Sequence, residues 1–211
     1  SAASDVYKRQ ALNCENNRDE RSRYLLVENR KVENYVDMAL YYARMDAVYK
    51  DYMIAESNLQ EVAQQVLLQN KYYLIQSHVK AEVACPDTVY SDKKWIAFIL
   101  NQLIQNSVKY GRSEGTHIQI VTKKTKRGVL LRVKDDGIGI PKEEIPRIFE
   151  KGFTGTNGRN RERSTGMGLY LCRKLCDKLN IEIRAESAEG KGTEIILMFP
   201  VSDYLTGYRE T

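Results

Sequence analysis

The alternation of apolar and polar residues predicts a chain that is helical at first and then mixes helices with strands. Between residues 21 and 50, Leu25, Val32 and Ala39 recur every seven residues while charges fill the other faces, which is typical of an amphipathic helix. One helix cannot bury such a seam alone, so we expect it to pack on a second helix in a dimeric hairpin or on the body of the domain. Residues 1–19 are polar and aperiodic, and we predict no element there.

Apolar side chains spaced three and four residues apart predict further helices along the chain. The predicted helices cover residues 59–77, 93–110, 142–151 and 169–179. Ser57 is a start signal for the first of them. Ser91-Asp92 can cap the long second helix, and Gly111 can close it.

Short alternating segments predict strands, and two pairs of them form hairpins around residues 123–128 and 189–192. The predicted strands cover residues 79–85, 116–122, 129–134, 181–186 and 193–199. Together these elements predict an α+β fold in which helices cover one face of a mixed sheet, a two-layer sandwich.

Length and charge narrow the class of protein. A chain of 211 residues allows one domain plus an appendage. The net charge of +5 is spread along the chain with no basic stripe that carries interleaved aromatic residues, so we predict no nucleic-acid partner. The longest apolar run, from Trp95 to Leu100, is too short to span a bilayer, and we expect any membrane attachment outside this chain.

The cysteines and histidines do not show the spacing of a metal site. Cys172 and Cys176 lie one helical turn apart on a predicted helix, which favours a buried apolar face over zinc. His78 and His117 are not paired with cysteines in a zinc-binding pattern, and we predict structural or surface roles for both. A reducing cytoplasm is the simplest setting for such cysteines.

The first candidate for chemistry is the stretch from Asp135 to Pro141, which directly follows a predicted strand. Gly137 and Gly139 let its backbone take positive φ angles and approach a ligand closely. A carboxylate at the end of a strand can accept a hydrogen bond from an exocyclic amine such as that of adenine. Taken alone, the pattern is more typical of an ordinary strand-to-helix turn.

A second candidate lies at the end of the long predicted helix. Asn106 and Lys109 are three residues apart and project from one face. An amide oxygen is a good Mg²⁺ ligand, a lysine offers a positive charge to a phosphate, and Tyr110 offers a flat ring to a purine. Without other signals, the same residues fit a solvated helix end.

A third candidate is the glycine-rich region that ends at a helix start. Seven of the 13 glycines fall between residues 137 and 168, and Lys151, Arg159, Arg161 and Arg163 lie in the same region. Thr165-Gly166-Met167-Gly168 leads into the next predicted helix, where backbone N–H groups can bind an anion. This is not a Walker loop, because no GxxxxGKS or GxxxxGKT pattern is present.

The order of these segments along the chain is itself informative. It also includes Phe149, Phe153 and Gly190-Lys191-Gly192-Thr193. Their order and spacing resembles the N, G1, F, G2 and terminal Gly-Thr boxes of the sensor histidine kinase catalytic domain, the Bergerat ATP-binding fold. The resemblance covers about residues 57–200. The segments 152–159 and 164–171 look most like the intramembrane-sensing subgroup that responds to cell-envelope antibiotics.

The resemblance implies ATP and Mg²⁺ as cofactors and assigns roles to the residues in the boxes. It makes Asp135 the residue that reads adenine, Asn106 and Lys109 the catalytic residues, and Asn106 and Gln102 the metal ligands. Gln102 stands where many members carry an asparagine. The implied nucleotide contacts are Gln102, Asn106, Lys109, Tyr110, Asp135, Gly137, Gly139, Ile140, Phe153, Thr165, Gly166, Met167, Gly168, Leu169 and Thr193.

The resemblance also divides the chain. Residues 33–44 resemble the second helix of the kinase dimerisation hairpin, so we expect residues 20–54 to be a remnant of that hairpin. Residues 55–202 would form the ATP-binding domain, with residues 203–211 as a tail. The chain has no H-x-x-K-T-P-like acceptor motif. We therefore expect this chain to begin just after the acceptor, to bind ATP and not to phosphorylate itself.

In the family, the γ-phosphoryl group of ATP passes to a histidine and then to an aspartate of a response regulator. The implied partners are a cognate response regulator, a second copy joined through the hairpin, and a membrane sensor or transporter. The implied location is the cytoplasmic portion of a bacterial plasma-membrane protein. Two alternatives stay open: a catalytically silent nucleotide-binding regulatory module, and a serine kinase or ATPase of the same fold. The helix at residues 21–50 and the absence of a glutamate four residues before Asn106 weigh against the second.

Overall fold

The computed structural model describes residues 52–156 and 165–201, together with individual residues between 22 and 42. The chain divides into two units, residues 1–44 and 45–211. In the first unit, the described residues are all helical, as predicted. Leu25, Val32 and Ala39 of its apolar seam are exposed. Arg159, Arg161 and Arg163 lie outside the described residues.

The second unit is built on a mixed five-stranded sheet with the order β2-β4-β5-β7-β6. Strand β2 runs parallel to β4, and every other neighbouring pair is antiparallel. The strands are β2 (Val79–Ala84), β4 (Thr116–Thr125), β5 (Gly128–Asp135), β6 (Glu182–Ala188) and β7 (Gly192–Pro200). All five predicted strands and both predicted hairpins are confirmed.

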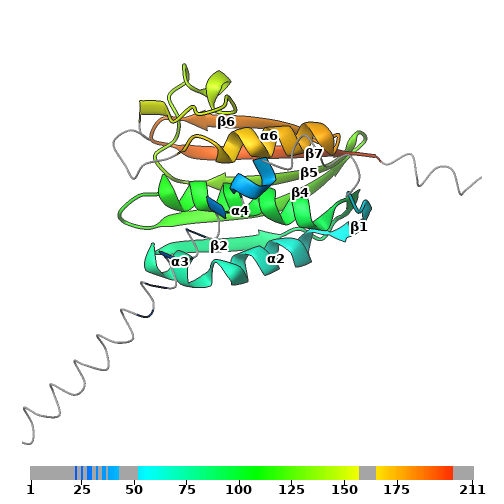
Figure 1. Cartoon of the computed structure of the whole chain (residues 1–211), viewed down its shortest axis with the longest axis horizontal. Coiled ribbons are helices and arrows are strands. Elements are labelled where there is room, and N and C mark those ends of the chain that lie inside the picture. Colours follow the sequence, from blue (N-terminus) through cyan, green and yellow to red (C-terminus); the bar gives the residue numbers. More distant parts are fainter. Residues whose placement is uncertain are drawn as a thin grey trace, which may run out of the picture. The chain divides into compact units, whose positions relative to one another are not determined.

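Three helices cover one face of this sheet: α2 (Leu59–Gln69), α4 (Lys93–Lys109) and α6 (Gly168–Lys178). Figure 1 shows them side by side in front of the strands. Alternate strand residues such as Ile118 and Leu131 are fully buried beneath the helices, because successive side chains of a strand point to opposite faces. The predicted two-layer sandwich is confirmed.

The long helix α4 begins and ends where its sequence signals predict. Asp92 is its N-cap, and one carboxylate oxygen accepts a hydrogen bond from the Lys94 amide at 2.9 Å. The other accepts one from the Met53 amide at 2.9 Å, which ties the start of the unit to this helix. At the far end Gly111 donates its N–H to the Val108 carbonyl at 3.2 Å. Bonds within the fold therefore satisfy some of the backbone groups that each helix end leaves without an intrahelical partner.

The predicted helix at residues 59–77 is two helices, α2 and α3 (Lys71–Gln76), separated at Asn70. The Asn70 side-chain amide donates to the Val66 carbonyl and to the Asn101 side chain, both at 2.8 Å. A side chain that bonds its own backbone in this way competes with continuation of the helix. Because Asn70 is buried, this competition is decided by tertiary contacts that the apolar spacing does not report.

The prediction of a helix at residues 142–151 is wrong. The segment contains only a short 3₁₀ turn, η1 (Ile145–Arg147), with turns on either side. Pro146 has no N–H to donate to the carbonyl four residues earlier, and its ring clashes with a continuing α-helix. A single 3₁₀ turn tolerates a proline near its start.

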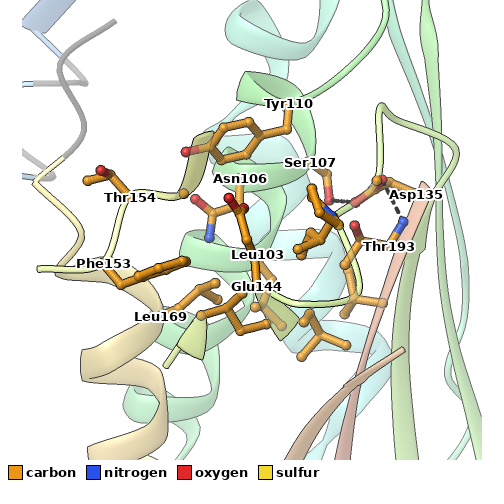
Figure 2. A pocket seen from close by; sticks show the side chains of 17 residues that line it. Leu103, Asn106, Ser107, Tyr110, Asp135, Glu144, Phe153, Thr154, Leu169 and Thr193 are labelled. Atoms are coloured by element: carbon orange, nitrogen blue, oxygen red, sulfur yellow. Dashed lines mark hydrogen bonds between the residues drawn. The ribbon is translucent and has the colours of Figure 1, made fainter. Parts of the chain in front are cut away.

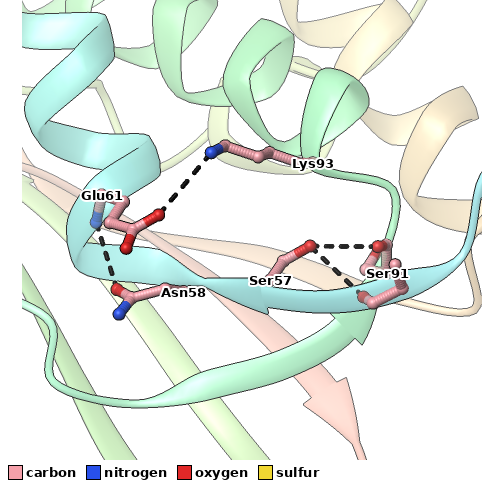
Figure 3. A network of polar contacts seen from close by, with 6 residues as sticks. Ser57, Asn58, Glu61, Ser91 and Lys93 are labelled. Atoms are coloured by element: carbon pink, nitrogen blue, oxygen red, sulfur yellow. Dashed lines mark hydrogen bonds and ion pairs between the residues drawn. The ribbon is translucent and has the colours of Figure 1, made fainter.

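A small second sheet, formed by β1 (Ala55–Asn58) and β3 (Thr88–Ser91), was not predicted. Strands of four residues are too short to show clear alternation. Figure 3 shows how this sheet leads into the helices. The Ser57 hydroxyl donates to the Ser91 carbonyl at 3.2 Å, so Ser57 lies in the strand, and the N-cap of α2 is Asn58, which accepts from the Glu61 amide at 3.1 Å.

Cys172 and Cys176 are fully buried on the core face of α6, as predicted. His117 lies in β4 with its Nε2 atom 3.2 Å from a carboxylate oxygen of Glu82, and His78 follows α3 with a φ angle of 53°. Among the residues that the structure describes, no helix has both the length and the apolar character needed to cross a membrane.

Candidate functional site

A pocket opens where the C-terminal half of α4 meets the ends of β5 and β7, the loop after β5 and the start of α6 (Figure 2). Its walls are largely apolar, with a few polar groups set among them, which is typical of sites for small organic ligands. It is lined by Leu103, Asn106, Ser107, Tyr110, Val133, Asp135, Gly139, Ile140, Pro141, Glu144, Ile148, Phe153, Thr154, Gly155, Leu169, Thr193 and Ile195.

One side of the pocket is formed by a single stripe of α4 and its C-cap residue, Tyr110. Leu103, Asn106, Ser107 and Tyr110 are spaced three and four residues apart, and all four line the pocket. Such spacing places side chains above one another on one helix face. The stripe presents an amide, a hydroxyl and an aromatic ring within two helical turns.

The most strongly held polar group is the carboxylate of Asp135, the last residue of β5. Its Oδ2 atom accepts a hydrogen bond from the Ser107 hydroxyl at 2.8 Å. Its Oδ1 atom accepts from the backbone amides of Gly137 at 3.0 Å and Thr193 at 3.2 Å. Figure 2 shows Ser107 and Thr193 on either side of this carboxylate.

The Asp135 carboxylate has one acceptor position that no described residue fills. A carboxylate offers about four acceptor positions, and the described residues fill two on Oδ1 and one on Oδ2. Burial raises the pKa of this carboxyl above its ordinary value, while the bonds from Ser107, Gly137 and Thr193 act in the opposite direction. The remaining position on Oδ2 is thus available to an N–H donor inside a largely apolar pocket.

The turn after Asp135 packs closely against the backbone of other segments. The Ile138 amide donates to the Tyr110 carbonyl at 3.0 Å, and the Ile138 carbonyl accepts from the Gly190 amide at 2.7 Å. Gly139 has a φ angle of 71°, and a Cβ atom there would lie 2.0 Å from the Ala188 carbonyl oxygen. Only glycine satisfies both the conformation and the close approach.

The opposite side of the pocket comes from residues 150–156 and the segment before α6. The Gly152 amide donates to the Gly166 carbonyl at 3.1 Å, and a Cβ atom on Gly166 would lie 2.4 Å from the Gly152 carbonyl carbon. This contact sets the position of Phe153, whose ring lies against the Arg147 guanidinium at 4.6 Å. Glu144 accepts a hydrogen bond from the Thr156 amide at 2.8 Å.

The start of α6 carries no side-chain cap and no acidic residue in its first turn. The first N–H groups of a helix have no partner within the helix, so they can bind an anion at the positive end of the helix dipole. Leu169, in this first turn, lines the pocket.

The structure brings eight of the predicted site residues to the pocket wall. They are Asn106, Tyr110, Asp135, Gly139, Ile140, Phe153, Leu169 and Thr193. Gly137 supports the site through its bond to Asp135 and does not line the pocket itself. Gly166 does not line the pocket either; it contacts Gly152, the residue before Phe153.

The other predicted residues lie outside the lining: Gln102, Lys109, Thr165, Met167 and Gly168. The Nζ atom of Lys109 lies 5.9 Å from the Tyr110 ring centre. Gln102 is buried, and a Cβ atom on Gly168 would lie 2.8 Å from its Oε1 atom. Its Nε2 atom has no hydrogen-bond partner among the described residues. The Gln102 amide thus lies against the first residue of α6.

Several functional positions were not predicted, above all Ser107 and Glu144. Ser107 lies on the apolar face of α4 four residues after Leu103, and a hydroxyl on a buried face needs a partner. That signal was available in the sequence. The sequence contained no comparable signal for Glu144, because its place in the pocket follows from the turn at Pro146 and not from a helix.

The pocket wall contains one of the two predicted magnesium ligands. Mg²⁺ prefers oxygen ligands and commonly takes one or two from the protein, with substrate phosphates and water supplying the rest. Asn106 provides an amide oxygen in the pocket wall. Gln102 reaches a different place, beside α6, so the two predicted metal ligands do not line one cavity.

The model of the Histidine kinase-, DNA gyrase B-, and HSP90-like ATPases matches residues 91–203. Sensor histidine kinase YxdK of Bacillus subtilis (strain 168) is 34% identical over 174 residues, which cover 82% of this chain and 54% of that protein. Sensor protein kinase GraS of Staphylococcus aureus (strain N315) is 36% identical over 189 residues, 87% of this chain and 53% of that protein. This chain thus spans about half the length of these relatives.

Solved structures show the same architecture. The nucleotide-free catalytic domain of histidine kinase ThkA is 26% identical, with a TM-score of 0.61 over 70% of this chain and 97% of its own. A second ThkA structure, in complex with response regulator protein TrrA, has a TM-score of 0.62 at 23% identity and covers 84% of this chain and 49% of its own. The latter likeness concerns the fold alone.

Proposed function

We propose that this chain, which belongs to the Histidine kinase-, DNA gyrase B-, and HSP90-like ATPase family, binds ATP in the pocket beside Asp135 as the catalytic part of a sensor histidine kinase. The observation that carries the proposal is the buried Asp135 carboxylate with one acceptor position left on Oδ2. The exocyclic amine of adenine is a donor of the right kind. The apolar walls would take the purine ring, with Tyr110 at its edge.

The phosphates would extend from the adenine toward Asn106 and the start of α6. Uncapped N–H groups at that helix start suit an anion. Asn106 would hold Mg²⁺ through its amide oxygen, and the ion, when bound, would neutralise charge on the phosphate oxygens. Lys109, Thr165, Gly166, Met167 and Gly168 remain predicted contacts that would depend on movement of their segments when the nucleotide binds.

The proposed reaction is transfer of the γ-phosphoryl group to a histidine of the intact kinase. The bond from the γ-phosphorus to the bridging oxygen breaks, a phosphorus–nitrogen bond forms on the imidazole, and ADP leaves. The contribution of this chain is to orient the nucleotide and balance its charge. Since it contains no H-x-x-K-T-P-like motif, we expect it to bind ATP without phosphorylating itself.

The wider setting is proposed from the relatives. The phosphoryl group would pass on to an aspartate of a cognate response regulator, and ThkA, solved in complex with TrrA, offers a precedent. The helix at residues 21–50 would pair in a homodimeric hairpin. The intact protein would be a bacterial membrane kinase with this portion in the cytoplasm, working with a membrane sensor or transporter of the antibiotic-responsive kind.

A catalytically silent nucleotide-binding module of the same fold is the second candidate. It is favoured by one observation: Gln102, a predicted metal ligand, does not line the pocket. To separate the two, the chain is mixed with a dimerisation domain that carries the acceptor histidine, and labelled ATP is added. Acid-labile label on the added domain supports the kinase, and binding without transfer supports the silent module.

The binding claim itself is tested by titration calorimetry with ATP. We expect Asp135→Asn to weaken ATP binding about 10- to 100-fold, the range for loss of a charge-assisted hydrogen bond. An asparagine can keep the bonds to Gly137 and Thr193 through its oxygen, so the fold should persist. Unchanged affinity in Asp135→Asn, or no binding by the wild-type chain, would contradict the proposal.

A further inference from the structure

Arg112, which follows α4, connects this segment with the turn after β5 and the turn between β6 and β7. Its Nε atom donates to the Asp136 carbonyl at 2.8 Å and lies 3.4 Å from the Gly137 carbonyl. Its Nη2 atom donates to the Gly190 carbonyl in the turn between β6 and β7. One guanidinium thus binds carbonyl groups of two separate turns.

The peptide between Asp136 and Gly137 is held from both ends. Its carbonyl accepts from Arg112 Nε at 2.8 Å, and its N–H donates to Asp135 Oδ1 at 3.0 Å. In a planar trans peptide the C=O and N–H groups point in opposite directions. This single peptide therefore transmits the position of the guanidinium to the carboxylate.

We propose that Arg112 is a positioning residue for adenine recognition, which acts on Asp135 through the Asp136–Gly137 peptide; this rests on the proposed function of the pocket. The guanidinium fixes the plane of that peptide and polarises it, and hydrogen bonds in series strengthen one another. The Gly137 N–H then holds Oδ1, so that Oδ2 keeps its orientation toward the ligand.

The chemistry of the side chain explains why an arginine suits this place. A guanidinium presents several N–H donors in a rigid planar fork, so it can serve carbonyl groups on two turns at once. A lysine offers a single charged centre on a flexible stem. Arg112 is exposed, so water screens part of its effect, and we expect an influence smaller than that of Asp135 itself.

The test compares ADP and IDP, since inosine carries a carbonyl oxygen in place of the adenine amine. For Arg112→Ala we expect ADP to bind about five- to tenfold more weakly and IDP to change less than twofold, because only the amine uses Asp135. Arg112→Lys should fall between wild type and Arg112→Ala. Urea unfolding of each variant gives its stability. If Arg112→Ala does not fold, the comparison of ADP with IDP is made with Arg112→Lys.

Coupling to Asp135 separates positioning from a general structural effect. In an Asp135→Asn background, Arg112→Ala should weaken ADP by less than about twofold, because the group that it positions has changed. The matched control is Arg127→Ala: Arg127 is an exposed arginine at the other end of the sheet, bound to Glu182 at 2.7 Å. We expect wild-type affinity for this control.

The outcomes distinguish the two claims. If Asp135→Asn weakens ADP and Arg112→Ala leaves it unchanged, or if Arg112→Ala weakens ADP and IDP equally, the positioning role is refuted while the proposed function stands. If the wild-type chain does not bind ADP, or if Asp135→Asn binds it normally, the proposed function itself fails.

Discussion

The two ends of the pocket are built in different ways. At the Asp135 end, the carboxylate belongs to a central strand, and three hydrogen bonds from α4, the turn and β7 hold it. At the Phe153 end, the wall is a loop whose described contacts include the backbone bond from Gly152 to Gly166, the Glu144–Thr156 bond and the packing of Arg147 on Phe153. The first end is part of the core, and the second is supported locally.

This difference predicts that the two ends of the pocket bind different parts of the nucleotide. Groups that read a rigid base gain from a carboxylate whose position does not vary, because orientation is fixed before the ligand arrives. Groups that meet a flexible triphosphate gain from a wall that can adjust to it. We therefore expect mutations at the two ends to separate stability from binding.

The largest effect is expected at the Asp135 end, for Gly139→Ala. The φ angle of 71° disfavours any side chain, and the new Cβ atom would lie 2.0 Å from the backbone oxygen of Ala188. Since β6 and β7 cannot move freely, we expect the free energy of unfolding to fall by about 2–4 kcal/mol, with loss of ATP binding. Urea unfolding measures the stability, and calorimetry measures ATP binding.

The matched control is Gly190→Ala, where the φ angle is 75° but nothing lies within 4 Å of the Cβ atom. A control as damaging as Gly139→Ala would show that backbone conformation, and not the collision, decides the result.

A smaller effect on stability is expected at the other end, for Gly166→Ala. The new Cβ atom would collide with the Gly152 carbonyl at 2.4 Å, but this loop can shift with Phe153. We expect a loss of about 1–2 kcal/mol in stability and a clear loss of ATP affinity as the wall is displaced. The same unfolding and binding assays apply. If stability fell as far as in Gly139→Ala, the two ends would not differ in rigidity.

The smallest effect is a pH dependence of stability at Asp135. Burial raises the pKa of this carboxyl above the ordinary 3.8, so the folded protein takes up the proton more readily than the unfolded chain. The stability that Asp135 contributes is therefore complete below its ordinary pKa and is lost as the pH rises through the raised value. Asparagine does not titrate. The stability of Asp135→Asn relative to wild type should accordingly increase between pH 4 and pH 7 in urea unfolding, and a decrease would contradict the stated direction of the pKa shift.

Much of this arrangement could be predicted from the sequence, because periodic apolar patterns and local motifs are local signals. The sheet, α4 and α6 were found in this way, whereas Asp135, Asn106 and Tyr110 became site residues only through the resemblance of the ordered motifs to a known family. The helix at residues 142–151 was wrongly predicted because the apolar spacing outweighed Pro146. The sheet of β1 and β3 was missed because its strands are too short for alternation to show.

The supporting residues of the site could not be predicted as readily. Arg112 binds carbonyl groups that lie 24 and 78 residues away along the chain, and no local pattern reports such contacts. Gln102 lies one residue before Leu103 of the pocket stripe, a rotation of about 100° around α4, and its amide lies against the start of α6. Motifs name the groups that touch a ligand, whereas tertiary contacts determine which groups hold them in place.

The central claim is that the Asp135 carboxylate accepts a hydrogen bond from the adenine amine. The most direct measurement is the nitrogen–oxygen distance in a structure of this chain with ADP. We predict the adenine amine within about 2.7–3.2 Å of Asp135 Oδ2, the range of an N–H···O hydrogen bond, with Ser107 still bound to the same oxygen. An adenine bound elsewhere, or bound in the pocket with its amine turned away from Asp135, would contradict the account.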